Sequence, residues 1–259
     1  MRMMKKVLGT VTVLALSVSL LAGCGSTAAS PVSSAASTAA ESTTSSIVPE
    51  TTSAAADENV AAAAQLLNDL TGSYQELWPV ILADKYQQTW LDDCAALVGE
   101  ENAEAAFEKL SSMVTGDVYG EDAVEAYANG GGAYFCGFTN SLATLTFDGE
   151  TSTISGTDKD GNVLFSHTYH YIGMEPVHGL YEFESDDADS GEFTYFFLAP
   201  DTSAETYHIE FRYGSDADAL SQYDAGDYAY WLASGISTDC DQTMIDNCIE
   251  LFCTENLAG

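Results

Sequence analysis

Short runs of alternating apolar and polar residues between positions 141 and 214 constrain the fold of this chain more than any other feature. Successive side chains of a β-strand point to opposite faces, so this alternation is typical of strands that are buried on one face. The segment "SLATLTFDGETSTISGTDKDGNVLFSHTYHYIGM" predicts two or three strands, with turns at Asp148-Gly149 and Asp160-Gly161. The runs "GLYEFES", "EFTYFFLA" and "TYHIEFRYG" continue the pattern. Consecutive short strands at this spacing predict an antiparallel barrel or a strongly curved sheet.

Helical patterns flank the strands on both sides. Apolar spacing and composition predict helices over residues 60–70, 78–98, 102–114 and 121–128, and again over 217–224 and 242–253. Three consecutive glycines at 130–132 separate the first helical region from the strands. The expected fold class is therefore α+β and mainly β, with helices before and after the sheet.

The first residues have the composition of an export signal. Arg2, Lys5 and Lys6 precede an apolar run from Val7 to Leu21, which is too short for a transmembrane helix. The run ends in "LAGC", which resembles a bacterial lipobox and predicts cleavage before Cys24 and lipidation of that residue by a diacylglyceryl group and palmitate. The alternative is an ordinary signal peptide followed by a chance cysteine. Lipidation would anchor the protein to the outer face of the cytoplasmic membrane without spanning it.

The segment that follows the signal has almost no large apolar side chains. Residues 25–58 are nearly all Ser, Thr and Ala, a composition that cannot bury enough surface to offset the entropy of ordering. The predicted organisation is a signal peptide over 1–23, the lipidated cysteine with a disordered tether over 24–58, and one domain over 59–259. This domain has about two hundred residues, enough for a sizeable core.

The charge of the mature chain excludes one class of partner. Removing the signal leaves four basic residues against forty acidic ones, a net charge of 4 − 40 = −36. Binding to nucleic acid requires Lys and Arg for phosphate contacts, so nucleic acid is not expected as a partner. The acidic surface is compatible both with simple solubility and with attraction of cations.

Five cysteines remain in the mature domain: Cys94, Cys136, Cys240, Cys248 and Cys253. An exported chain favours disulfides, and an odd number leaves at least one thiol unpaired. Cys248 and Cys253 are five residues apart on a predicted helix, about 140° around its axis, which is poorly suited to a paired zinc-ligand set. The pairing of the cysteines is not determined by the sequence.

Histidines are few, and most have an ordinary explanation. His167 and His170 are three residues apart on a predicted strand and should point to opposite faces, so only one of them could reach a shared site. His178 lies in a predicted turn. The chain contains no G-x-S-x-G, no H-E-x-x-H and no glycine-rich phosphate loop, so no enzyme class has specific support and a binding protein is expected.

Four segments occur in the order in which the ZinT family has them. "LTGSYQELWPVI" resembles the opening of that family, and "YHYIGMEPV…GLYEFE" resembles its paired strands. "EFTYFFLAPDTSAETYHIEFRYGSDADAL" is similar to its signature strand pair, and "YAYWLASGIS" to its aromatic C-terminal segment. The resemblance, which spans residues 70–237, implies a calycin-like, lipocalin-type barrel with an N-terminal helical cap and a C-terminal helix. It also implies zinc recruitment outside the cytoplasm, with delivery to a zinc ABC importer or its solute-binding protein.

The family holds its metal mainly through three histidines, one closing an "S-D-H" segment and two forming "H-x-H" on the next strand. Only the second H-x-H position carries over, as His208, because Thr206 replaces the first and "LAPDTS" replaces the S-D-H segment. The resemblance implies that His208 points into the barrel, with Glu210 on the same strand face. The expected remaining ligands are Asp201, which is nearest to the lost histidine, and His178.

Two functions follow from these observations. The first is a surface-anchored protein that binds a divalent metal ion, most simply zinc, and assists its uptake. The alternative is a calycin-type binding module in which the barrel holds a small apolar or amphipathic ligand and the family metal site is lost. The aromatic content and the two missing histidines motivate this alternative, and a barrel interior filled by side chains would exclude it.

Overall fold

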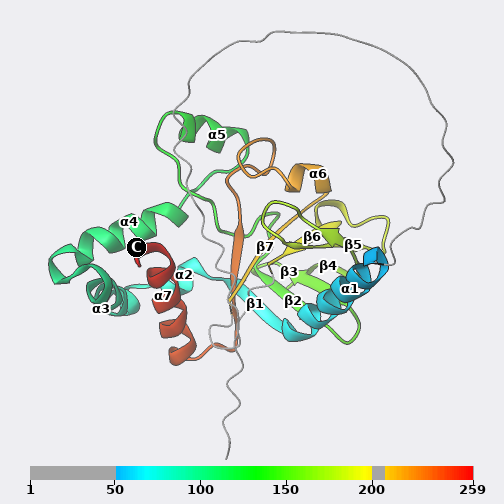
Figure 1. Ribbon diagram of the computed structural model, residues 1–259, viewed down its shortest axis with the longest axis horizontal. Coiled ribbons are helices and arrows are strands. Elements are labelled where there is room, and N and C mark those ends of the chain that lie inside the picture. The colour runs from blue at the N-terminus through cyan, green and yellow to red at the C-terminus, as the bar shows by residue number, and fades with distance from the viewer. Residues whose placement is uncertain (1–50, 200–207, 259) are drawn as a thin grey trace, which may run out of the picture.

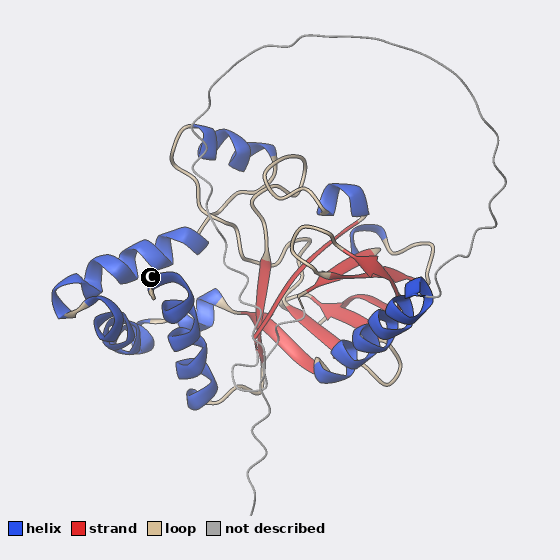
Figure 2. Cartoon of the chain, viewed as in Figure 1, coloured by secondary structure: helices blue, strands red, loops and turns tan. Residues whose placement is uncertain are grey.

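Eight antiparallel strands form a closed barrel in the computed structural model, which describes residues 51–199 and 208–258, with side chains from Glu58 onward (Figures 1 and 2). Each strand pairs with the next, and β8 pairs with β1 to close the ring. The strands are β1 (Gly72–Glu76), β2 (Thr144–Asp148), β3 (Thr153–Thr157), β4 (Val163–Met174), β5 (Tyr181–Ser185), β6 (Tyr195–Leu198), β7 (His208–Gly214) and β8 (Ala233–Ser237). The predicted barrel is confirmed.

The helices of the described chain lie outside the barrel. They are α1 (Thr51–Asp69), α2 (Trp78–Ile81), α3 (Gln87–Val98), α4 (Ala103–Val114), α5 (Glu121–Ala128), α6 (Ala217–Leu220) and α7 (Gln242–Leu257). Helix α1 packs along β2 and β4, whereas α2, α3 and α4 join α7 in a separate bundle beside the barrel, here called the helical cap (Figure 1). Most of the cap is therefore an insertion between β1 and β2. None of these helices has both the length and the apolar character needed to cross a bilayer.

Several predicted helices differ in extent from those observed: α6 ends at Leu220 rather than at 224, and α7 continues to Leu257 rather than ending at 253. Helix α1 begins at Thr51, inside the segment predicted to be a tether. The helix predicted over 78–98 is interrupted, because α2 ends at Ile81 and a single 3-10 turn, Asp84–Tyr86, precedes α3. The interruption lets the indole N–H of Trp90 donate to the carbonyl of Ile81 at 2.8 Å, so the turn is stabilised by packing that a helical period does not reveal.

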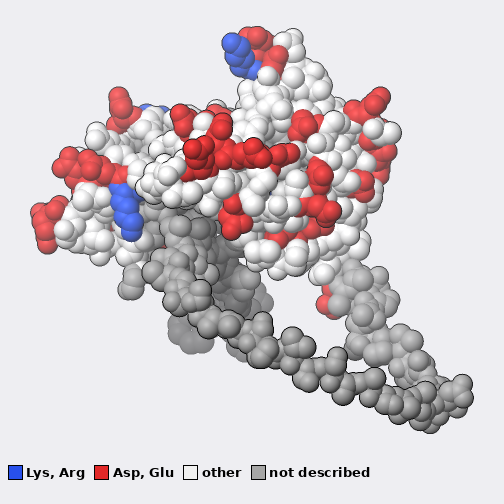
Figure 3. Space-filling view, turned by 90° about the horizontal axis from the view of Figure 1, so that it is seen from above, with Lys and Arg blue, Asp and Glu red and all other residues white. Residues whose placement is uncertain are grey.

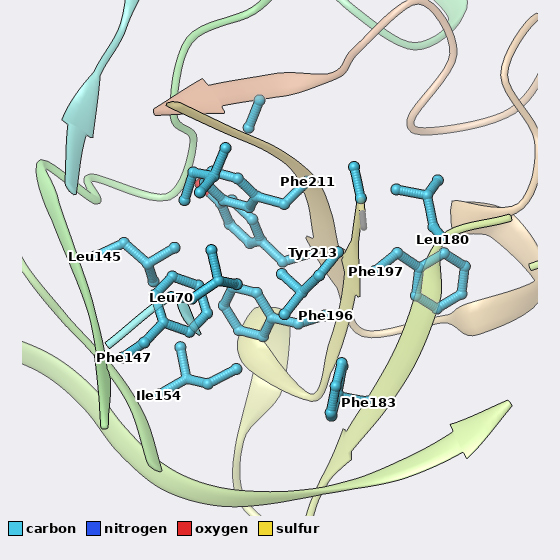
Figure 4. Close-up of a cluster of buried hydrophobic side chains, with 14 of the residues drawn as sticks. Leu70, Leu145, Phe147, Ile154, Leu180, Phe183, Phe196, Phe197, Phe211 and Tyr213 are labelled. Carbon is cyan, nitrogen blue, oxygen red and sulfur yellow. The ribbon is translucent and has the colours of Figure 1, made fainter. Parts of the chain in front are cut away.

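Side chains fill the barrel interior. Figure 4 shows the central cluster, in which Leu145, Phe147, Ile154, Phe183, Phe196, Phe211 and Tyr213 are at most 1% exposed. The strand register explains the cluster, because Phe183, Phe196 and Tyr213 are directly opposite one another on three neighbouring strands. An eight-stranded barrel is just wide enough for side chains to fill. The interior is a packed core, which counts against the alternative of a ligand held inside the barrel.

A second apolar cluster joins the helical cap to the outside of the barrel. Trp78, Trp90 and Leu110 from the cap pack in it with Ile236 of β8, and Ile249 of α7 is fully buried there. All five residues of β8 are buried, because one face contacts the barrel core and the other contacts the cap. The cap therefore covers the outer face of the barrel at β8 and its neighbour β7.

Candidate metal-binding residues

His208 and Glu210 lie at the junction between the barrel and the helical cap. His208 is the first residue of β7 and is 9% exposed. Its register partner is Ile236, which belongs to the cap cluster, and the partner of Glu210 is Ser234. Directly opposed residues share a sheet face, so both side chains are on the face that the cap covers. The prediction that His208 and Glu210 share a face is confirmed.

The expectation that this face points into the barrel is wrong. Ile209, Phe211 and Tyr213 occupy the interior, where they pack with the other aromatic side chains of the core. Because side chains alternate along a strand, His208 and Glu210 must then project outward. The apolar set takes the interior since burial of aromatic side chains without unsatisfied polar atoms is the more favourable arrangement.

Two thiols of the second apolar cluster are influenced by the charge of Glu210. Cys136 and Cys248 are both buried, and burial first and the Glu210 carboxylate second raise the pKa of each thiol to about 12. Both are therefore protonated at neutral pH. Sequence analysis did not place them here, because Cys136 precedes β2 and Cys248 lies on α7, so no spacing relates either one to Glu210. Imidazole, carboxylate and thiolate are all ligand types that zinc accepts.

The described residues do not form a complete metal site by themselves. Within 51–199 and 208–258, no group of three or more His, Cys, Asp or Glu side chains is arranged to hold a metal ion. His208 and Glu210 supply two donors of suitable type on one face. Asp201, the predicted third ligand, and Cys24, the predicted lipidation site, lie outside the described residues and stay predictions.

The structure does not bring His178 to His208. The ring of His178 packs on Tyr223, with centroids 3.8 Å apart, and its Nδ1 is 3.5 Å from Oε2 of the fully buried Glu175. Tyr223 in turn lies over the guanidinium of Arg212, at 4.3 Å. Arg212 is four residues along β7 from His208, about 13 Å at the rise of a β-strand. His178 thus belongs to a different polar cluster from His208.

Arg212 organises that cluster. Its side chain is fully buried, and its two terminal nitrogens donate to the backbone carbonyls of Leu220, Gln222 and Tyr228. Burial lowers the pKa of the guanidinium, which is partly offset by its aromatic and acidic neighbours. These hydrogen bonds hold the 220–228 segment against the outside of the barrel, so the role of Arg212 is structural.

His167 and His170 each pair with an aspartate after β5. His167 Nδ1 is 2.7 Å from Asp187, and His170 Nδ1 is 2.7 Å from Asp186. His167 stacks on the core residue Phe165, whereas His170 is half exposed, so the prediction that they point to opposite faces is confirmed. His170 Nε2 also lies 3.9 Å from Glu184, which makes this histidine a natural control for non-specific cation binding at the acidic surface.

Acidic side chains are spread over the surface, and few basic ones are visible on the face in Figure 3. A shallow cleft of about 350 Å³ opens between the barrel and the cap. Its lining includes Glu76, Trp78, Phe135 and Cys136, so it reaches one of the thiols near Glu210.

Comparison with known proteins gives structural likenesses only. No family model matches the chain, and no curated protein matches it. Among solved structures, it is similar to the Zn(II)-bound ZinT-like domain of AdcA from Streptococcus pneumoniae, with 15% identity and a TM-score of 0.44 over 70% of this chain and 87% of that domain. It is also similar to Zn(II)-bound AdcA from the same organism, with 13% identity and a TM-score of 0.41 over 71% of this chain. The matched region spans only 34% of the complete AdcA chain.

Proposed function

We propose that this chain is an extracytoplasmic lipoprotein that binds a divalent metal ion, with zinc as its cargo, and assists the uptake of that metal. The observation that supports the proposal best is the placement of His208 and Glu210 on one face of β7, in the junction between barrel and cap. The lipobox at Cys24 and the ordered ZinT-like segments support it from the sequence. The protein would act as a binding protein rather than an enzyme.

The donor types at the junction suit zinc. A neutral imidazole and a carboxylate are both common zinc ligands, and a metal ion bound nearby would also favour ionisation of a thiol. In the proposal, Asp201 completes the ligand set from the segment before β7. The anchored protein would pass the metal to a zinc ABC importer or its solute-binding protein, and its lipid would be its contact with the membrane.

The test is a competitive zinc titration of the full chain, purified in detergent, and of His208→Ala and Glu210→Gln. We expect one zinc ion per chain, and binding at least about tenfold weaker in both variants, since each removes a donor. His170→Ala is the matched control, because it removes a half-exposed histidine that has its own carboxylate partners. Zinc binding that is unchanged in His208→Ala would contradict the proposal.

The pH dependence gives a second measurement on the same samples. Zinc binds neutral imidazole, so protons compete with the metal and binding should weaken between pH 7.4 and pH 5.5. Binding that depends on neither His208 nor pH would show that only the acidic surface is being titrated. The proposal would then fail even if some zinc were retained.

A further inference from the structure

Two of the five cysteines in the mature domain have their sulfur atoms in contact. The Sγ atoms of Cys94 on α3 and Cys253 on α7 are 3.8 Å apart, and both residues are fully buried in the helical cap. Helices α3 and α7 pack against each other over much of their length. A disulfide has an S–S distance of about 2.05 Å, so the sulfurs need to approach by only about 1.8 Å.

We propose that Cys94 and Cys253 form a disulfide in the exported protein, which covalently joins α7 to α3. The proposal rests on the export proposed above but not on metal binding. The other three cysteines are placed differently. Cys136 and Cys248 are near Glu210, and Cys240 is partly exposed before α7.

The chemistry is a thiol–disulfide exchange. The two thiols lose two protons and two electrons, and a disulfide oxidant accepts them and is reduced to two thiols. Thiolate is the attacking species, and burial raises the pKa of both Cys94 and Cys253 in the folded chain. Exchange in the folded state is therefore slow, and the bond should form while the cap is still folding and the thiols are accessible.

The position of the bond gives it a structural consequence. The two cysteines are 159 residues apart in sequence, so the bond closes a long loop that contains the strands from β2 to β8 and leaves only β1 of the barrel outside it. Cross-links that close long loops restrict the unfolded chain most. Helix α7 also carries Cys248, which lies near Glu210, so fixing α7 to α3 fixes one wall of the barrel–cap junction.

The test is thiol mapping of the full chain after refolding with oxidised and reduced glutathione. The protein is denatured without reductant, alkylated, digested and analysed by mass spectrometry. We expect a Cys94–Cys253 cross-linked peptide pair and alkylation at positions 136, 240 and 248, and also at Cys24 in chains where that residue carries no lipid. Alkylation of both Cys94 and Cys253, or a bond from either to another cysteine, would overturn the proposal.

Variants add a second readout. Cys94→Ser should free Cys253 for alkylation and abolish the dependence of the thermal midpoint on reductant. Cys240→Ser is the matched control and should retain both the cross-link and that dependence. A thermal midpoint of the oxidised wild-type chain that does not fall on reduction would overturn the proposed role in holding α7. Because refolding with glutathione requires neither export nor zinc, its outcome is independent of the function proposed above.

Discussion

At the scale of single residues, the buried side chain of Arg212 holds a neighbouring segment against the outer face of the barrel. Arg212 alternates with the aromatic residues of β7, and it projects away from the core to meet the carbonyl of Leu220 at the end of α6 and two carbonyls of the irregular segment that follows. Carbonyls of irregular backbone lack the hydrogen-bond partners that a helix or sheet provides. The planar guanidinium of a buried arginine carries several N–H donors, so it can satisfy several such carbonyls at once. Arg212 accordingly ties the two ends of the 220–228 segment to β7 through one side chain.

Replacing this side chain should be costly. We expect Arg212→Met to lower the free energy of unfolding by about 3 kcal/mol, because it leaves buried carbonyls without donors. Urea denaturation followed by tryptophan fluorescence measures the change, and Lys159→Met, which removes an exposed cation beside the β3–β4 turn, is the control. Equal unfolding midpoints for the two variants would refute the role assigned to Arg212.

Buried tyrosines should make the protein sensitive to alkali. Burial raises the pKa of Tyr127 to about 12, with Tyr134 and Tyr230 adding to the effect, and burial also raises the pKa of Tyr213. The folded state then holds phenolic protons that the unfolded state releases near pH 10. Stability is fully present below pH 10 and falls as the pH rises towards 12.

Tyr127→Phe should reduce this sensitivity. The variant keeps the ring that stacks on Tyr230, at 3.7 Å between centroids, and removes only the hydroxyl. Thermal midpoints at pH 8, 10 and 11 should fall less steeply for the variant than for the wild type. Parallel curves would mean that Tyr127 does not contribute.

At the scale of secondary-structure elements, α7 depends on the residue that caps its N-terminus. Asp241 precedes the helix, and its carboxylate accepts the backbone N–H of Met244 at 3.0 Å. We expect Asp241→Ala to destabilise the protein by about 1 kcal/mol, the usual value of an N-cap. Asp239→Ala removes the same charge two residues earlier and should have little effect in the same urea experiment. If both variants lose equal stability, charge rather than capping is responsible.

The sequence predicted the run of strands from β2 to β7 and missed β1 and β8. Strands such as β2 and β3 alternate because one face meets the core and the other meets water. Strand β8, "ASGIS", is buried on both faces and has no alternation to detect, and β1 is short and mostly half-buried. The helix at 121–128 was predicted with the observed bounds.

The candidate site was less predictable than the fold. Spacing placed His208 and Glu210 on one face, but it could not say which face would be covered by a helical insertion. Cys136 lies before Glu210 in the sequence and Cys248 after it, and only tertiary packing brings both thiols under the influence of its charge. His178 is drawn instead to Glu175 and Tyr223.

At the scale of the whole molecule, charge should dominate the response to salt. The net charge of −36 expected for the mature chain makes the compact state self-repelling, and added ions screen this repulsion. The screening length falls from about 30 Å at 0.01 M salt to about 3 Å at 1 M. We expect the thermal midpoint to rise by several degrees over this range. Choline chloride should act as sodium chloride does, and a rise with sodium alone would indicate a specific ion effect.

The pairing of the first strand with the last affects when the barrel can form. Tyr74 of β1 pairs with Ser237 of β8, so nearly the whole chain must be available before the ring closes. Contacts between residues this distant in sequence form slowly. For a chain that is exported, as proposed here, late closure has a use. The polypeptide would remain unfolded while it passes through a narrow translocation channel. It would fold into the closed barrel only after β8 has crossed the membrane.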